Sequence, residues 1–204
     1  MTTRGAFRLM ACCMLLALAG CASAPATVYT LNPAAQPVAK SPAADRATFS
    51  VAVGPVRVPE AVDRPELVLR EGTNRIQILE LHRWSQPLAA EIAQALVTDL
   101  AARLPQARVM PNPSSVAQGA DYRITVDVGR FDAIAGEAVE VWAAWRINPT
   151  QGKPVIGQSR IREAVEGAGN DAVVAAFARA VARIGDDLAA SLSSLSASGR
   201  ASKR

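Results

Sequence analysis

Two segments of the sequence carry apolar residues at the spacing of an α-helix, and several segments between them alternate as β-strands do. From Ser85 to Leu104 an apolar residue recurs every four positions, and from Asn170 to Leu195 every three or four. This spacing gives each helix one apolar side that must be buried against another element. The two apolar rows are Leu88, Ile92, Leu96, Leu100 and Leu104, then Val173, Phe177, Val181, Ile184, Leu188, Leu192 and Leu195. We expect Ser85 and Asn170 to cap the helices, with Pro87 in the first turn.

The alternation is clearest in residues 121–131 and 137–147, where every second residue is apolar. Gly54-Pro55 and Gly129 interrupt two strands and predict bulges. Residues 155–164 are more polar, as in an edge strand. The pattern predicts an α+β fold, a largely antiparallel sheet with two amphipathic helices packed on one face. The other predicted strands are 48–58, 67–70, 75–80 and 107–110.

The N-terminus has the layout of a bacterial lipoprotein signal. Two arginines precede an apolar run from Leu9 to Ala19, which is too short for the ~20 residues of a membrane span. Small residues then lead to Cys21, as in a lipobox. We expect residues 1–20 to be removed and Cys21 to carry the lipid anchor.

The cysteines agree with this expectation. The chain has three, and two of them lie inside the signal. With Cys21 acylated, the mature chain has no thiol nucleophile, disulfide or cysteine metal site. No cofactor is expected besides the covalent lipid on Cys21, whose acyl chains hold the protein on a membrane.

The rest of the chain divides into three parts. Residues 21–46 form a lipidated N-terminus and Pro/Ala-rich tether, residues 47–195 one domain, and residues 196–204 a disordered basic tail. Without the signal and this tail, basic and acidic residues nearly balance. The charge therefore indicates no nucleic-acid partner.

No arrangement of residues indicates catalysis. His82 is the single histidine, and we expect it at the surface of the strand-to-helix junction rather than in a zinc site or a triad. Residues 167–172 match G-x-G-x-x-A, but no second strand follows to supply a ribose-binding acid, so we interpret the glycines as a turn. Asp186-Asp187 is interpreted as a solvated helix face. A P-loop is also missing from the sequence. We interpret the chain as a non-enzyme.

Three further segments resemble the ABC-type transport auxiliary lipoproteins, the PqiC group. They are Tyr29-Thr30-Leu31, the run from Val58 to Pro65, and Arg83-Trp84-Ser85-Gln86-Pro87-Leu88. The last is similar to an R-W-A-E-P-L-like stretch of that family, with serine and glutamine in place of alanine and glutamate. The resemblance spans nearly the whole mature chain.

The resemblance implies lipid trafficking across the Gram-negative envelope, with a periplasmic MCE-domain protein as partner. Ala22, in place of an aspartate, favours anchoring to the periplasmic leaflet of the outer membrane. A structural or assembly lipoprotein remains an alternative, and so does a lipid carrier with its own cavity, although the helix rows have the density of a packed core.

Four residues are candidates for partner binding or for structure: Arg64, Arg83, Trp84 and Trp142. We expect Trp84 to pack under the helix and Arg83 to pair with an acid of the preceding loop. Trp142 faces away from the apolar side of its strand, where another copy of the protein or the MCE partner could meet it. Alternatively, the segment near Tyr29 folds back over Trp142.

Overall fold

The computed structural model describes residues 24–31 and 47–201. The predicted signal, Cys21, residues 32–46 and the last three residues of the tail lie outside the described residues. The strands are β1 (Thr27–Tyr29), β2 (Phe49–Arg57), β3 (Glu66–Glu71), β4 (Arg75–Trp84), β5 (Ala107–Pro111), β6 (Tyr122–Ile134), β7 (Ala138–Pro149) and β8 (Val155–Ala164). The helices are α2 (Leu88–Arg103) and α3 (Gly169–Ala201), with 3₁₀ turns η2 (Glu60–Val62) and η3 (Ser115–Ala117).

All eight strands join one mixed sheet built around β6. On one side, β6 pairs with β7 and β7 with β8, both antiparallel. On the other side, β2 runs parallel to the first part of β6, and β3 meets β6 at Ile134. The strands β5, β4 and β1 continue the sheet from β2, β3 and β4. Among the described strands β8 pairs with β7 alone, which confirms it as an edge strand.

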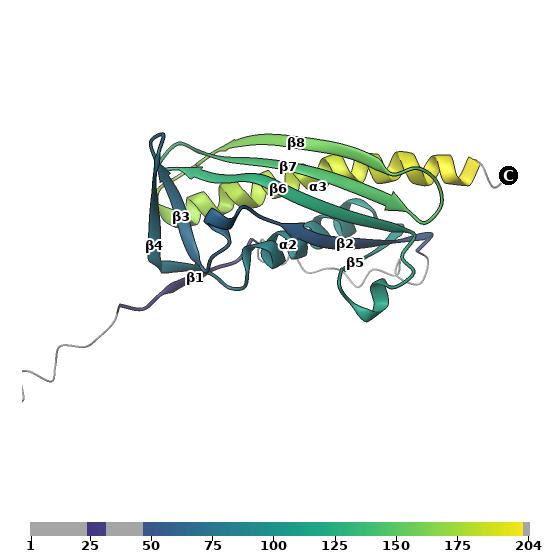
Figure 1. The fold of residues 1–204 in the computed structure, drawn as a ribbon, viewed down its shortest axis with the longest axis horizontal. Coiled ribbons are helices and arrows are strands. Elements are labelled where there is room, and N and C mark those ends of the chain that lie inside the picture. The colour runs from purple at the N-terminus through teal and green to yellow at the C-terminus, as the bar shows by residue number, and fades with distance from the viewer. Residues whose placement is uncertain (1–23, 32–46, 202–204) are drawn as a thin grey trace, which may run out of the picture.

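The predicted fold class is confirmed. Antiparallel ladders hold most of the paired residues, and both helices pack on one face of the sheet, α2 against β2 and β5 and α3 against β7 and β8 (Figure 1). Ile92, Leu96 and Leu100 of the first apolar row are fully buried, as are Val181, Ile184 and Leu188 of the second. Register shifts after Val53 and Val128 confirm both predicted bulges.

Several predicted element ends were wrong. Pro87 occupies the N-cap position of α2 with no side-chain cap, because the Ser85 hydroxyl bonds to Glu91 instead. β4 continues through Trp84, since β1 pairs with its last three residues. The helix α3 runs to Ala201, so the part of the tail from Ser196 to Ala201 is helical rather than disordered. The Ser/Ala composition of this segment suggested disorder. It also allows the helix to continue, because alanine has the highest helix propensity.

The largest difference concerns the N-terminal segment. Residues 27–31 belong to the folded domain, whose start we had placed at Ala47. A three-residue strand has no periodicity to recognise, and its partners lie more than fifty positions away in the sequence. Within the described residues, no helix is long and apolar enough to cross a membrane.

Candidate functional site: the seat of the N-terminal segment

The N-terminal segment is fixed at one end of the sheet by backbone pairing. β1 lies parallel to the end of β4, with Tyr29 opposite Trp84. The backbone N–H of Ser85 then donates to the carbonyl of Tyr29 at 2.7 Å. Leu31, two residues further on, has no exposed surface. The segment therefore enters the core instead of lying on the surface.

A buried carboxylate holds the segment from the other side. Glu91 of α2 is 1% exposed and accepts a hydrogen bond from the backbone N–H of Leu31 at 3.0 Å. The hydroxyl of Thr30 donates to the same oxygen at 3.0 Å, and the hydroxyl of Ser85 donates to the other oxygen at 2.5 Å. Three donors from two distant parts of the chain thus converge on one carboxylate. Hydrogen bonds to a charged acceptor are stronger than neutral ones, and here they offset the cost of burying the acid.

Tyr29 completes this arrangement, which we call the seat: Tyr29, Thr30 and Leu31 together with His82, Ser85 and Glu91. The hydroxyl oxygen of Tyr29 lies 3.0 Å from Nδ1 of His82, and the two rings stack with centroids 5.9 Å apart. Burial raises the pKa of the Tyr29 phenol, and the charge and hydrogen bonding of Asp171 on α3 raise it further. His82, which we expected to lie on the surface of the junction, is instead half-buried in β4 beside Tyr29.

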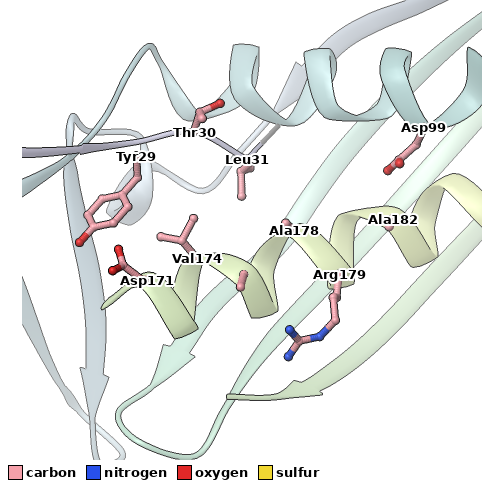
Figure 2. Close-up of a pocket in the computed structure, with 10 residues that line it drawn as sticks. Tyr29, Thr30, Leu31, Asp99, Asp171, Val174, Ala178, Arg179 and Ala182 are labelled. Atoms are coloured by element: carbon pink, nitrogen blue, oxygen red, sulfur yellow. The ribbon is translucent and has the colours of Figure 1, made fainter. Parts of the chain in front are cut away.

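A groove of about 430 Å³ adjoins the seat between the N-terminal segment and α3 (Figure 2). Small apolar side chains form much of its wall, and Asp99 of α2 lies at its far end (Figure 2). Burial raises the pKa of Asp99, although Arg103 pairs with it at 3.2 Å and acts in the opposite direction. The lining residues are Tyr29, Thr30, Leu31, Asp99, Asp171, Val174, Ala175, Ala178, Arg179 and Ala182.

This arrangement suits holding a chain segment more than chemistry. The polar groups of the seat already bond to one another, and the groove beside it is largely apolar. In the part of the chain that the structure describes, His, Cys, Asp and Glu form no group of three that could hold a metal ion.

Two of the sequence-predicted residues meet at one acid. Arg64 pairs with Glu66 at 3.3 Å, and Arg83 approaches the other oxygen of Glu66 at 3.9 Å. The partner of Arg83 is thus the first residue of β3, directly after the loop in which we expected it. Both arginines are partly exposed and border the turn around η2.

Trp84 lies in the core. It is 6% exposed and contacts Phe131 and Phe177 edge-on, each with ring centroids 6.4 Å apart. Phe131 of β6 stacks on Phe177 of α3 at 3.9 Å. The three rings join the end of β4 to the central strand and to α3.

Trp142 lies on the opposite, open face of the sheet and is 41% exposed. The guanidinium of Arg130 lies 4.3 Å from its ring centroid, and that of Arg160 lies 5.4 Å away. Glu140 pairs with Arg130 at 2.6 Å. Tyr29 is held against His82 and Asp171, so the alternative in which the segment near Tyr29 covers Trp142 was wrong.

Sequence reasoning missed Glu91, the central residue of the seat. A signal was present, because Glu91 follows Leu88 by three positions and precedes Ala95 by four, which puts it on the buried side of the helix. An acid in that position needs donors from outside the helix. Its donors, Thr30 and Leu31, could not be named from spacing alone.

The fold and the seat together define a class: an α+β domain, with two helices on one face of a mixed sheet, that incorporates its own N-terminal segment. The model of the family described as ABC-type transport auxiliary lipoprotein component matches residues 29–189. The chain therefore belongs to this family, and the resemblance seen in the sequence is confirmed. The match begins at Tyr29, the first residue of the seat.

Two crystal structures share the fold. An uncharacterised protein superposes with a TM-score of 0.68 at 21% identity, covering 83% of this chain and 99% of its own. A protein from Xanthomonas campestris gives a TM-score of 0.58 at 17% identity, covering 81% of this chain and 90% of its own. Among curated proteins, no sequence matches this chain.

Proposed function

We propose that this protein is the anchored, non-catalytic auxiliary lipoprotein of a lipid transport system in the Gram-negative envelope. Lipid on Cys21 holds it to the periplasmic leaflet of the outer membrane, and the domain binds a periplasmic MCE-domain protein. The observation that carries the proposal is the family match. The family is described as a transport auxiliary lipoprotein component, and the matched residues begin at Tyr29, in the fixed N-terminal segment.

The packing of the core favours this role over a carrier that encloses its own lipid. Beside the aromatic cluster of Trp84, Phe131 and Phe177 the free space is only about 10 Å³, room for about one water molecule. The larger groove beside the seat, although largely apolar, is open to solvent rather than enclosed. A packed domain suits a protein that binds a partner.

The partner surface in this proposal is the open face of the sheet around Trp142. Tryptophan and arginine are the residue types enriched at interface hot spots, and here two arginines flank a half-exposed indole. Of the described elements, α2 and α3 both pack on the other side of the sheet, so neither helix covers Trp142.

Affinity capture of the lipidated protein from solubilised envelopes tests the role. We expect an MCE-domain protein to be recovered with the wild type and lost with Trp142→Glu. Val116→Glu is the control, because Val116 is exposed on η3, which packs against Ala52 and Met110 at β2 and β5 rather than beside Trp142. Recovery of outer-membrane assembly components alone would support the structural alternative instead.

Two measurements separate the causes of a lost interaction. Both variants should unfold at the wild-type temperature, and size-exclusion chromatography should show whether Trp142→Glu dissociates copies of this chain from one another. A separate fractionation of the envelope tests the anchor: Cys21→Ser should leave the membrane or accumulate as precursor. If Cys21→Ser still matures and sediments with outer membrane, the anchor is wrong.

A further inference from the structure

Exposed aliphatic side chains gather on β1 and β4. Of the seven large hydrophobic residues that are exposed in the described part of the chain, these two strands hold four. The exposed fractions are 61% for Val28, 43% for Ile76, 39% for Ile78 and 46% for Leu81. The remaining three are Val116, Trp142 and Ile156, on three separate elements.

The register shows which way the side chains of β4 point. Ile76 and Ile78 are two residues apart, so they lie on one face of the β3–β4 hairpin. Ile78 is opposite Val68, whereas the neighbouring β3 residues Leu67 and Leu69 are buried on the other face. The two isoleucines therefore point outward. β1 pairs only with His82–Trp84, and no other described strand covers the outer edge of β4 before that point.

The hairpin and the start of β1 lie at the same end of the molecule, and α3 ends at the opposite end (Figure 1). The chain reaches this end directly from the anchor. Because Thr27 is already paired with His82, only the link from Cys21 to Thr27 joins the lipid to the fold. Six residues span at most about 20 Å, whereas α3, with its 33 residues, is about 50 Å long.

We infer that the outer face of the β3–β4 hairpin, around Ile76 and Ile78, rests on the phospholipid surface of the membrane that holds the anchor. The inference rests on the proposed acylation of Cys21. A link shorter than half the molecule keeps this end against the bilayer, and aliphatic side chains are stabilised there by leaving water. The anchor and the hairpin together fix the orientation of the domain, with the C-terminal end of α3 directed away from the membrane.

Site-specific quenching in vesicles tests the contact. The three cysteines of the precursor are Cys12, Cys13 and Cys21, so a cysteine introduced into the acylated mature protein is its only free thiol. Lipidated Ile78→Cys carries an environment-sensitive fluorophore in phosphatidylethanolamine/phosphatidylglycerol vesicles. Ile156→Cys is the matched control, because Ile156 is also exposed but lies far from the hairpin. Its partner Arg146 pairs with Thr125 of β6, and Thr125 is nine residues from Ile134, where β3 meets β6.

The expected result is several-fold stronger quenching of the Ile78 label than of the Ile156 label by acyl-chain nitroxides, with the reverse order for aqueous iodide. Equal quenching at both positions overturns the inference. A label at Ile78 that is shielded from both quenchers also overturns it, because a second copy of the chain would then cover the hairpin. Flotation separates this failure from that of the anchor: a wild type that does not float with vesicles refutes the anchor, and the hairpin contact falls with it.

Discussion

The indole ring of Trp145 covers Gly157, its direct partner on the neighbouring strand. A β-carbon at Gly157 would lie 2.1 Å from Cζ2 of the ring, far inside contact distance. The Nε1–H of Trp145 donates to the Ser159 hydroxyl at 3.2 Å, and that hydroxyl donates to Asp187 at 2.5 Å. The absence of a side chain at Gly157 of β8 thus makes room for the indole of Trp145 on β7. The hydrogen bond from Ser159 to Asp187 then links the edge strand β8 to α3.

We predict that Gly157→Ala destabilises the domain by about 1–3 kcal/mol, because the ring must move and its hydrogen bond with it. Gly129→Ala is the control, since a β-carbon there would meet no atom within 4 Å. The free energies of unfolding of the two variants, measured with urea, test this prediction: that of Gly157→Ala should be lower. Equal stability of the two variants would show that the ring can shift without loss.

Trp84→Ala should cost about 3–5 kcal/mol, because it empties the space beside the stacked rings of Phe131 and Phe177. The half-exposed Trp142 provides the comparison: Trp142→Ala removes cation–π contacts worth about 1 kcal/mol. Thermal and chemical unfolding should rank the two variants in that order. If Trp84→Ala melts like the wild type but no longer binds its partner, Trp84 acts in recognition and not in packing.

Glu91→Gln should destabilise the protein by about 1–3 kcal/mol. The amide nitrogen of glutamine is a donor, so it would oppose the donors of Leu31 and Thr30 or of Ser85. Ser85→Ala, which removes one donor, should cost about 1 kcal/mol. Limited proteolysis reports the local effect: we expect faster cleavage near Leu31 in Glu91→Gln than in Ser85→Ala. Unchanged cleavage would mean that backbone pairing alone seats the segment.

Stability should depend on pH through Asp99. Burial raises the pKa of Asp99 above its ordinary value of 3.8, so between that value and the raised one the native state binds more protons than the unfolded state. In that window the free energy of unfolding falls as pH rises. Asp99→Asn removes this fall, and its stability relative to the wild type should therefore increase as pH rises above 3.8.

The parts of this fold that follow from local pattern were predicted well. The apolar rows of α2 and α3, the alternation in β6 and β7 and the two glycine-marked bulges each need only neighbouring residues to specify them. The parallel pairings of β1, β2 and β3 could not be predicted, because they join segments far apart in the sequence. Neither could the last third of β4, which owes its strand form to β1.

The seat was missed for a similar reason. Tyr29, Thr30 and Leu31 followed the expected anchor and preceded a Pro/Ala-rich stretch, so they were interpreted as part of a tether. Tyr29 and Leu31 are buried against partners that include His82 and Glu91, which the sequence placed in a junction and on a helix without indicating what they face. Of the four predicted site residues, Trp84 and Trp142 followed the local pattern: Trp84 was expected to pack inside and lies in the core, and Trp142 was expected to face away from the apolar side and lies on the open face.

The pairing of β1 with β4 also determines how force would pass through the molecule. A pull on the N-terminus reaches Thr27 first, where the parallel ladder to His82–Trp84 resists it in shear, with several hydrogen bonds stretched together. Beyond the ladder, the hydrogen bonds that Thr30 and Leu31 donate to Glu91 transmit the remaining force directly to α2. Residues 32–46 come after this point in the chain, so tension applied at the N-terminus would enter the domain without passing through them.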